Sequence, residues 1–247
     1  MALSSETRDA RRRHLADAAQ TLIREQGDAG FSMTQLALRA GVSPATPYNL
    51  LGSKAEILRR VVREDFARFI TRLEGLRRDR PLAYLLQAAD LVVGHYEADR
   101  RLHQGLFRAA YGAEAAAVRD VMSAEGRALW RGFVEAAVEA GELARFVEPR
   151  PLTDVLLRAM GATAHTWLAD GWSRARFELE MAMAVRLILA SVSASPHREA
   201  MAAEIAQALA AIAALGAPSR PIPQSASEAP IASSSQAVPL SRLPASS

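Results

Sequence analysis

Apolar residues recur every three or four positions along most of this chain, which is the spacing of helices that bury one face. The first such helix is expected over residues 8–26, where the apolar face holds Leu15, Ala18, Ala19, Leu22 and Ile23. The alternation of apolar and polar residues that marks a half-buried strand is not seen along the sequence. The pattern therefore predicts an all-α protein.

Ser53 and Glu56 have the spacing of a capping box, which predicts the start of a long helix with apolar residues as far as Leu73. Further helices are expected over residues 81–98, 101–111, 113–140, 152–169, 173–193 and 198–215. The expected breaks between them are Arg80-Pro81, Gly112, Gly141, Pro149-Arg150-Pro151, Gly171 and Pro196. From residue 216 the composition shifts to Pro, Ser and Ala, which predicts a disordered tail over residues 216–247.

Residues 34–54 have the spacing of two short helices joined by a tight turn. Gly41 follows the first helix and suits the left-handed conformation that ends a helix. Ser43 is expected to cap the second helix, with Pro44 at its first position, where a missing N–H has no consequence. The segment therefore predicts a helix-turn-helix.

The second of these helices suits the DNA major groove, because its start carries small, uncharged residues. Thr46 and Asn49 are expected to hydrogen-bond base edges, and the small residues at 43–45 to approach them closely. Tyr48 and Lys54, the only lysine of the chain, suit phosphate contacts instead. The expected DNA-binding residues are Thr34, Ser43, Pro44, Ala45, Thr46, Tyr48, Asn49 and Lys54.

Residues 31–57 resemble the DNA-binding domain of the TetR family of bacterial transcriptional regulators. The family pattern is present in order as Gly27, Phe31, Thr34, Ala40-Gly41-Val42-Ser43, Thr46-Pro47-Tyr48 and Ser53-Lys54. With the helical layout, the resemblance implies an N-terminal arm and helix-turn-helix domain over residues 1–54. It implies a helical effector-binding and dimerisation domain over residues 55–215.

Two positions depart from the family pattern: Pro47 stands where a branched aliphatic residue is usual, and Leu51 where Phe is usual. With Ser43 as the cap, Pro47 removes only the first backbone hydrogen bond of the helix, back to the Ser43 carbonyl. The expected cost is nearer the ~1 kcal/mol of one hydrogen bond than the ~3 kcal/mol of an interior proline. We therefore expect the helix to survive with a loosened first turn.

The net charge of +3 is unevenly distributed. Residues 1–63 carry ten Lys and Arg against six Asp and Glu, whereas the rest carries 20 against 21, so the basic excess lies with the helix-turn-helix. Arg8, Arg11, Arg12 and Arg13 form an N-terminal cluster that either follows DNA phosphates or is a solvated arm.

The chain has no cysteine, which excludes disulfides and thiolate metal sites and suits a cytoplasmic protein. A signal-like apolar stretch is missing at the N-terminus, and the longest apolar runs, such as residues 205–217, are shorter than the about 20 residues of a membrane helix. We expect a cytoplasmic protein without a membrane span.

The helix expected over residues 173–193 is apolar in most directions, so it needs cover on more than one side. One face suits the core of its own domain, and the other suits a partner subunit, although a fully buried helix in a monomer has the same pattern. The family resemblance implies a homodimer through the helices near 152–169 and 173–193. Two-fold symmetry would then present two recognition helices to a palindromic operator.

Aromatic residues and histidines gather in the middle of the chain, where helical proteins hold small molecules. The resemblance implies a cavity for a small apolar or aromatic effector among the fifth to eighth helices, with movement of the fourth helix on binding. The candidate lining residues are His103, Phe107, Trp130, Phe133 and His165, for each of which ordinary packing is the alternative.

Neither a catalytic constellation nor a nucleotide-binding loop occurs in the sequence. The five histidines show no metal-binding spacing, since His165 has no His or carboxylate four residues away and Glu-x-x-His is missing. We therefore expect no cofactor, no metal and no enzymatic activity, although an all-α enzyme stays a third alternative.

The leading hypothesis is a sequence-specific, double-stranded DNA-binding transcriptional regulator, a repressor that a small-molecule effector releases from its operator. The alternative is a helix-turn-helix protein that acts mainly through a protein partner, with weak or lost DNA binding. Pro47 and the low charge of the second helix motivate that alternative.

Overall fold

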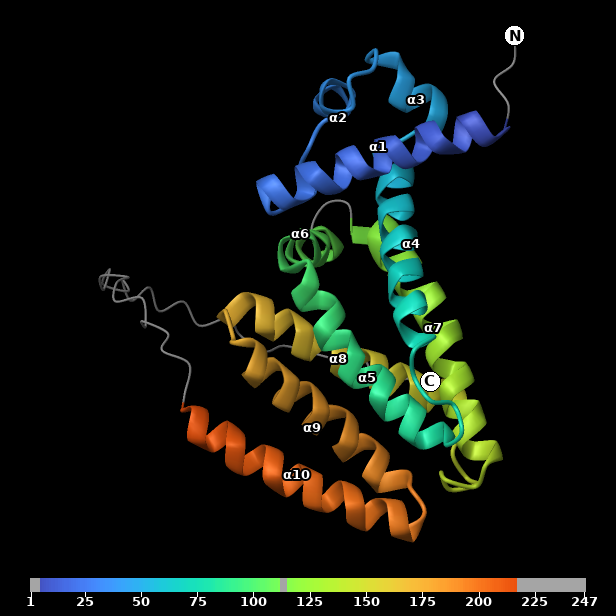
Figure 1. The fold of residues 1–247 in the computed structure, drawn as a ribbon, viewed down its shortest axis with the longest axis vertical. Helices are drawn as coiled ribbons and strands as arrows, with labels where there is room; N and C mark the ends of the chain where they lie inside the picture. The colour runs from blue at the N-terminus through green and yellow to red at the C-terminus, as the bar shows by residue number, and fades with distance from the viewer. Residues whose placement is uncertain (1–4, 112–114, 217–247) are drawn as a thin grey trace, which may run out of the picture.

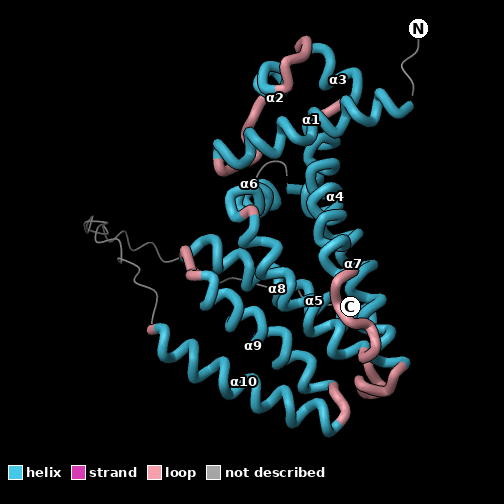
Figure 2. Tube along the Cα trace, viewed as in Figure 1, coloured by secondary structure: helices cyan, strands magenta, loops and turns pink. Residues whose placement is uncertain are grey.

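The computed structural model describes residues 5–111 and 115–216, and these ranges form ten α-helices (Figure 1). Apart from one isolated bridge between Leu143 and Ser193, the described residues lie in helices or loops (Figure 2). The all-α prediction is therefore confirmed. The helices are α1 (Ser5–Gln26), α2 (Met33–Arg39), α3 (Ala45–Leu51), α4 (Lys54–Leu73), α5 (Pro81–Ala98), α6 (Arg100–Tyr111), α7 (Ala115–Glu139), α8 (Pro149–Asp170), α9 (Arg174–Val192) and α10 (Ser195–Leu215).

Most helix boundaries match the expected ranges, and α5 matches at both ends. The break expected at Pro149-Arg150-Pro151 is wrong, because these residues form the first turn of α8. Pro196 likewise lies in the first turn of α10 rather than before it. The N–H groups of a first turn have no partner within the helix, so proline is tolerated there. The predicted tail, apart from Gly216, lies outside the described residues.

The helix caps differ in part from the expected ones. Ser53 caps α4 through its side chain, which accepts from the Glu56 backbone N–H at 3.2 Å. The reciprocal half of that box is not formed, because the Ser53 N–H donates to the Leu51 carbonyl. A complete capping box stands instead at the start of α2, between Ser32 and Gln35. Its Ser-x-x-Gln spacing was a readable signal in the sequence.

Helix α4 runs from α1 down beside α7 (Figure 1), and two clusters of buried side chains share its length. The first joins α1 and α2 to Ile57 and Val61 in the first half of α4, and it also includes Leu102 and Leu106 of α6. The second joins Phe69 and Leu73 near the end of α4 to helices α5 and α7–α9, with Phe107 of α6 and Met201 of α10. Helix α6 therefore contributes to both clusters, and its Leu102 and Leu106 pack with the N-terminal helices although it follows α5 in the sequence.

Helix α9 lies between α10 on one side and α5 and α8 on the other (Figure 1). Its fully buried face holds Phe177, Met181, Val185 and Leu189. Part of the cover that this apolar helix was expected to need thus comes from α10 of the same chain. In contrast, α10 buries only Met201 and Ala208, so most of its apolar surface faces outward.

Within the part of the chain that the structure describes, none of the helices is both long enough and apolar enough to cross a membrane.

Candidate nucleic-acid interface

The turn between α2 and α3 forms as expected, with Gly41 in the left-handed region at φ 64°. The predicted capping role of Ser43 is wrong: its hydroxyl hydrogen-bonds the Thr46 hydroxyl at 2.8 Å, and among the described residues no side chain caps α3. Helix α3 begins at Ala45, with Pro44 preceding it. The Thr46 hydroxyl is bonded to the Ser43 hydroxyl oxygen, which would otherwise accept a backbone N–H and cap the helix.

Pro47 is the buried residue of α3, so its ring packs inward and is not part of the exposed surface. The carbonyl of Ser43, which would receive a hydrogen bond from residue 47, accepts one from the Thr46 N–H at 2.9 Å. Although Pro47 has no N–H to donate, the Ser43 carbonyl therefore still accepts a hydrogen bond. The expectation that α3 survives is confirmed.

The predicted DNA-binding residues form an exposed surface along the start of α3. Ser43, Pro44, Ala45, Tyr48 and Asn49 are exposed, whereas Thr46 is half-buried. Thr34 is exposed at the start of α2, and Lys54 begins α4 with its Nζ 5.2 Å from the centre of the Phe31 ring. The surface joins small and polar side chains with an adjacent positive charge, as entry into a major groove requires.

Part of the N-terminal arginine cluster has a structural role that the sequence did not indicate. Arg12 donates from Nε to the Leu50 carbonyl at 3.0 Å, and so it holds the end of α3 against α1. Arg8, Arg11 and Arg13 are exposed on the same helix. The cluster is helical rather than an unstructured arm, and three of its four guanidinium groups face solvent.

The capping box of α2 supports the helix against which α3 is aligned. Removing it by Ser32→Ala is expected to lower the free energy of unfolding by about 1 kcal/mol, because the Gln35 N–H loses its side-chain acceptor. Urea denaturation measures the effect. Thr34→Ala, two residues further along and without a capping role, is the matched control. Equal stability of Ser32→Ala and wild type would contradict the observed cap.

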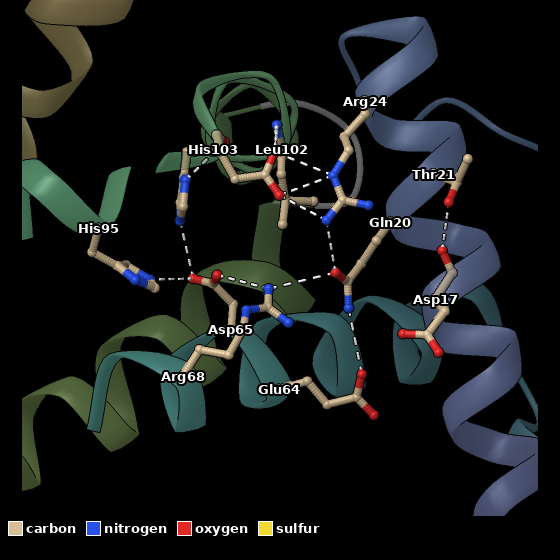
Figure 3. Close-up of polar contacts among 11 residues, drawn as sticks. Asp17, Gln20, Thr21, Arg24, Glu64, Asp65, Arg68, His95, Leu102 and His103 are labelled. Carbon is tan, nitrogen blue, oxygen red and sulfur yellow. Dashed lines mark hydrogen bonds and ion pairs between the residues drawn. The ribbon is translucent and has the colours of Figure 1, made fainter. Parts of the chain in front are cut away.

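Beyond the candidate DNA-binding surface, a polar network connects α1 to α4, α5 and the start of α6 (Figure 3). Arg24 of α1 pairs with Asp99 at 2.7 Å and donates to the Gln20 side chain at 3.1 Å. Arg68 of α4 reaches the same Gln20 oxygen at 3.4 Å and donates to Asp65 at 2.9 Å. These contacts tie the N-terminal helices to the rest of the molecule.

Asp65 lies at the inner end of this network, where His95 and His103 both point toward its carboxylate (Figure 3). The Oδ2 atom is 3.1 Å from Nε2 of each imidazole ring. Burial alone would raise the pKa of the Asp65 carboxyl, but the hydrogen bonds from His103 and His95 outweigh it and hold this pKa well below its usual value. Asp65 is therefore a carboxylate at neutral pH.

Sequence spacing does not reveal the Asp65–His95–His103 group, because its members come from α4, α5 and α6 and stand far apart in the chain. Pairs at three or four residues on one helix are the signal that spacing can detect. Here the turn between α5 and α6 brings the two histidines together, and α4 supplies the carboxylate.

Of the five candidate effector residues, Phe107 and Trp130 belong to the second buried cluster and Phe133 packs against it, whereas His165 lies apart. His103 and Phe107 are buried on α6, where both rings pack on Tyr96. Trp130 and Phe133 of α7 pack edge to face at 5.5 Å, and Phe133 also meets Tyr84 of α5. His165 is exposed on α8.

Both the sequence and the structure of this chain were compared with those of known proteins. No model of a known protein family matches the sequence. The HTH-type transcriptional regulator BetI of Rhizobium meliloti (strain 1021) is 30% identical over 137 residues, which cover 56% of this chain and 57% of BetI. The chain thus spans little more than half of that curated relative.

Solved structures resemble this one over most of their length. A protein assigned to the TetR family of transcriptional regulators, from Syntrophomonas wolfei str. Goettingen, has a TM-score of 0.63 at 14% identity, over 73% of this chain and 95% of that one. RolR in complex with resorcinol has a TM-score of 0.57 at 18% identity, over 89% of this chain and 98% of that one. These similarities establish the shared fold.

Proposed function

We propose that this chain, which has the fold of TetR-family transcriptional regulators, is a DNA-binding regulator that represses transcription from a palindromic operator. The observation that carries the proposal is the exposed surface of α3 from Ser43 to Asn49, next to Lys54 and the arginines of α1. Small residues there allow close approach to base edges, and the flanking cations suit phosphates. A repressor of this kind acts in the cytoplasm, where the chromosome lies.

Dimerisation would present the α3 surface twice. On α8, the exposed positions recur every three or four residues and carry mostly small or apolar side chains: Pro151, Val155, Arg158, Ala162, His165 and Ala169. Leu187 of α9 is also exposed, as is Leu209 of α10. This surface supports a homodimer through α8 and α9, with α10 as an added contributor that was not predicted.

A small apolar or aromatic effector is the proposed signal. His103 and Phe107 on α6, with Trp130 and Phe133 on α7, offer the aromatic lining that such ligands favour. His165 fits the proposed subunit interface better than a pocket, because it lies on the exposed face of α8. RolR binds resorcinol, a small aromatic molecule, on the same fold. Release of DNA requires that the effector bind the DNA-incompetent conformation more tightly.

The Lys54→Ala variant tests the DNA-binding proposal directly. We expect weaker binding to every duplex and a slope of log affinity against log salt that is flatter by about one unit, because one phosphate contact is lost. Gel-shift titration at several salt concentrations measures both. Arg131→Ala, an exposed charge on α7, is the matched control. An unchanged salt slope for Lys54→Ala would contradict the phosphate role.

The partner-protein alternative loses part of its motive in this structure. It was motivated by Pro47 and by the low charge of the second helix; Pro47 is buried and α3 is formed, which weakens the first motive. The exposed residues of α3 are mainly small or polar, whereas interfaces with proteins are enriched in large apolar side chains at their centre. Genome-wide mapping of bound DNA separates the two hypotheses, since only the regulator should enrich a shared sequence.

A further inference from the structure

Three side-chain atoms able to bind a metal converge behind the N-terminal helices (Figure 3). They are an oxygen of Asp65 on α4 and one ring nitrogen each of His95 on α5 and His103 on α6, and all three lie within 4.8 Å of one another. Both histidines are almost fully buried, at 4% and 3% exposure. The group is therefore preformed by the packing of three helices rather than by a flexible loop.

The hydrogen bonds of His103 direct one of its ring nitrogens at Asp65. Its Nδ1 is 3.0 Å from the backbone carbonyl oxygen of Asp99, which can only accept, so Nδ1 donates to it. Its Nε2 is 3.1 Å from the Asp65 carboxylate oxygen. The ring nitrogen that a metal would need therefore points at the carboxylate and not at the backbone.

We propose that Asp65, His95 and His103 form a binding site for a divalent transition metal of the zinc type. Two imidazoles and one carboxylate are a ligand set that such ions favour. With metal–ligand bonds of about 2.0–2.1 Å, a tetrahedral ion separates its ligand atoms by about 3.3 Å. The observed separation of 3.1 Å between Oδ2 and each Nε2 is close to that edge. Within the part of the chain that the structure describes, this group offers three ligand atoms, so a tetrahedral ion would take its fourth ligand from outside the group.

The surroundings orient the three ligands as the outer partners of metal sites do. The Asp99 carbonyl fixes the ring nitrogen of His103 that points away from the site. Arg68 holds the other oxygen of Asp65 at 2.9 Å, which leaves Oδ2 directed at the two histidines. The Tyr96 ring packs on His103 with 4.6 Å between ring centres. The second nitrogen of His95 is buried without a hydrogen-bond partner among the described residues.

The charge near the site is compatible with a dication. Asp65 contributes one negative charge, and the guanidinium of Arg68 bonded to it is nearly half exposed, so solvent screens it. Arg24, the next cation in the network, is neutralised by Asp99 at 2.7 Å. This proposal goes beyond DNA binding and does not depend on it, because it concerns only the groups that join α4, α5 and α6.

Titration of the full-length, metal-free protein with Co²⁺ tests the site, since tetrahedral Co²⁺ absorbs visible light and Zn²⁺ displaces it. We expect one Co²⁺ per chain with intense tetrahedral bands, and loss of these bands on adding Zn²⁺. Asp65→Asn and His103→Gln are each expected to weaken binding at least tenfold. His165→Gln, which changes an exposed histidine on α8, is the matched control and should bind as wild type does.

A His103→Cys variant extends the test, because the chain has no cysteine of its own. If residue 103 is a ligand, its thiolate adds a near-ultraviolet charge-transfer band to the bound Co²⁺, whereas His165→Cys adds none. Circular dichroism checks that each variant is folded. Wild type that binds no Co²⁺ or Zn²⁺ at micromolar concentration, or that binds as tightly as Asp65→Asn does, would overturn the proposal and leave Asp65, His95 and His103 as a hydrogen-bonded group only. The wild-type titration decides even where a variant does not fold.

Discussion

A triple variant with Thr46→Ala, Tyr48→Ala and Lys54→Ala is expected to lose specific DNA binding by a factor of at least about a hundred. A well-placed contact to a base edge contributes about 1–3 kcal/mol, and about 1.4 kcal/mol corresponds to tenfold in affinity. Tyr48 is 55% exposed beside Asn49, so its loss removes contact area on the DNA-facing surface rather than core packing. Fluorescence anisotropy on a duplex selected by the wild-type protein measures the loss.

The control for this variant must separate lost contacts from lost structure. Thr46 is half-buried and bonded to Ser43, so circular dichroism and thermal melting are needed to show that α3 stays folded. A double change at an exposed ion pair of α7, Arg131→Ala with Glu135→Ala, is the matched surface control and should leave binding intact. Selective binding retained by the folded triple variant would refute DNA recognition through α3.

The helical layout was predictable because glycine and proline mark it locally. Gly41 and Gly171 adopt the left-handed conformation that ends a helix, and α5 begins at Pro81 as expected. The errors have the same local origin. Proline tolerates the first turn of a helix as readily as it stops one, so the tract at 149–151 was interpreted as a break although it begins α8.

The exposed surface at residues 43–49 was predictable from a continuous segment, whereas the polar group behind it was not. Residues 43–49 are exposed largely as their spacing implied, because one short helix fixes all of them. His95 and His103 meet Asp65 only through the packing of α5 and α6 against α4, and nothing local in the sequence encodes that arrangement. The position of α6 beside α1 is equally non-local, although it brings Leu102 and Leu106 into the N-terminal core while Phe107 joins the other cluster.

Helix α6 contacts both buried clusters, so changes around α5 and α7 can reach the N-terminal helices through it. Its apolar residues Leu102 and Leu106 belong to the N-terminal core, while His103 and Phe107 face Tyr96 of α5. A ligand or ion that displaced α6 would therefore disturb both sides at once. How closely α6 can approach α1 is set by Gly105, where a side chain would meet the core.

Gly105→Ala is expected to lower the free energy of unfolding by about 1–3 kcal/mol, the usual cost of overpacking a core. A Cβ atom at this position would lie 2.3 Å from Cγ2 of Ile23, which is fully buried on α1, and 3.4 Å from the Asp28 backbone nitrogen. Ile23 cannot swing away, because its branched side chain is enclosed by the N-terminal core. Helix α6 must then move outward from α1. Urea denaturation measures the stability, and operator affinity reports the displacement.

Gly132→Ala on α7 is the matched control, since nothing lies within 4 Å of a Cβ atom placed there. That change should stabilise the protein by about 0.5–1 kcal/mol, because alanine loses less backbone entropy than glycine in a helix. The cause is tested by repeating Gly105→Ala in an Ile23→Ala background, where the clashing methyl group is gone. The two changes should then be strongly non-additive, since they act on one contact. Additive costs, or a Gly105→Ala protein as stable as Gly132→Ala, would show that α6 does not pack this closely on α1.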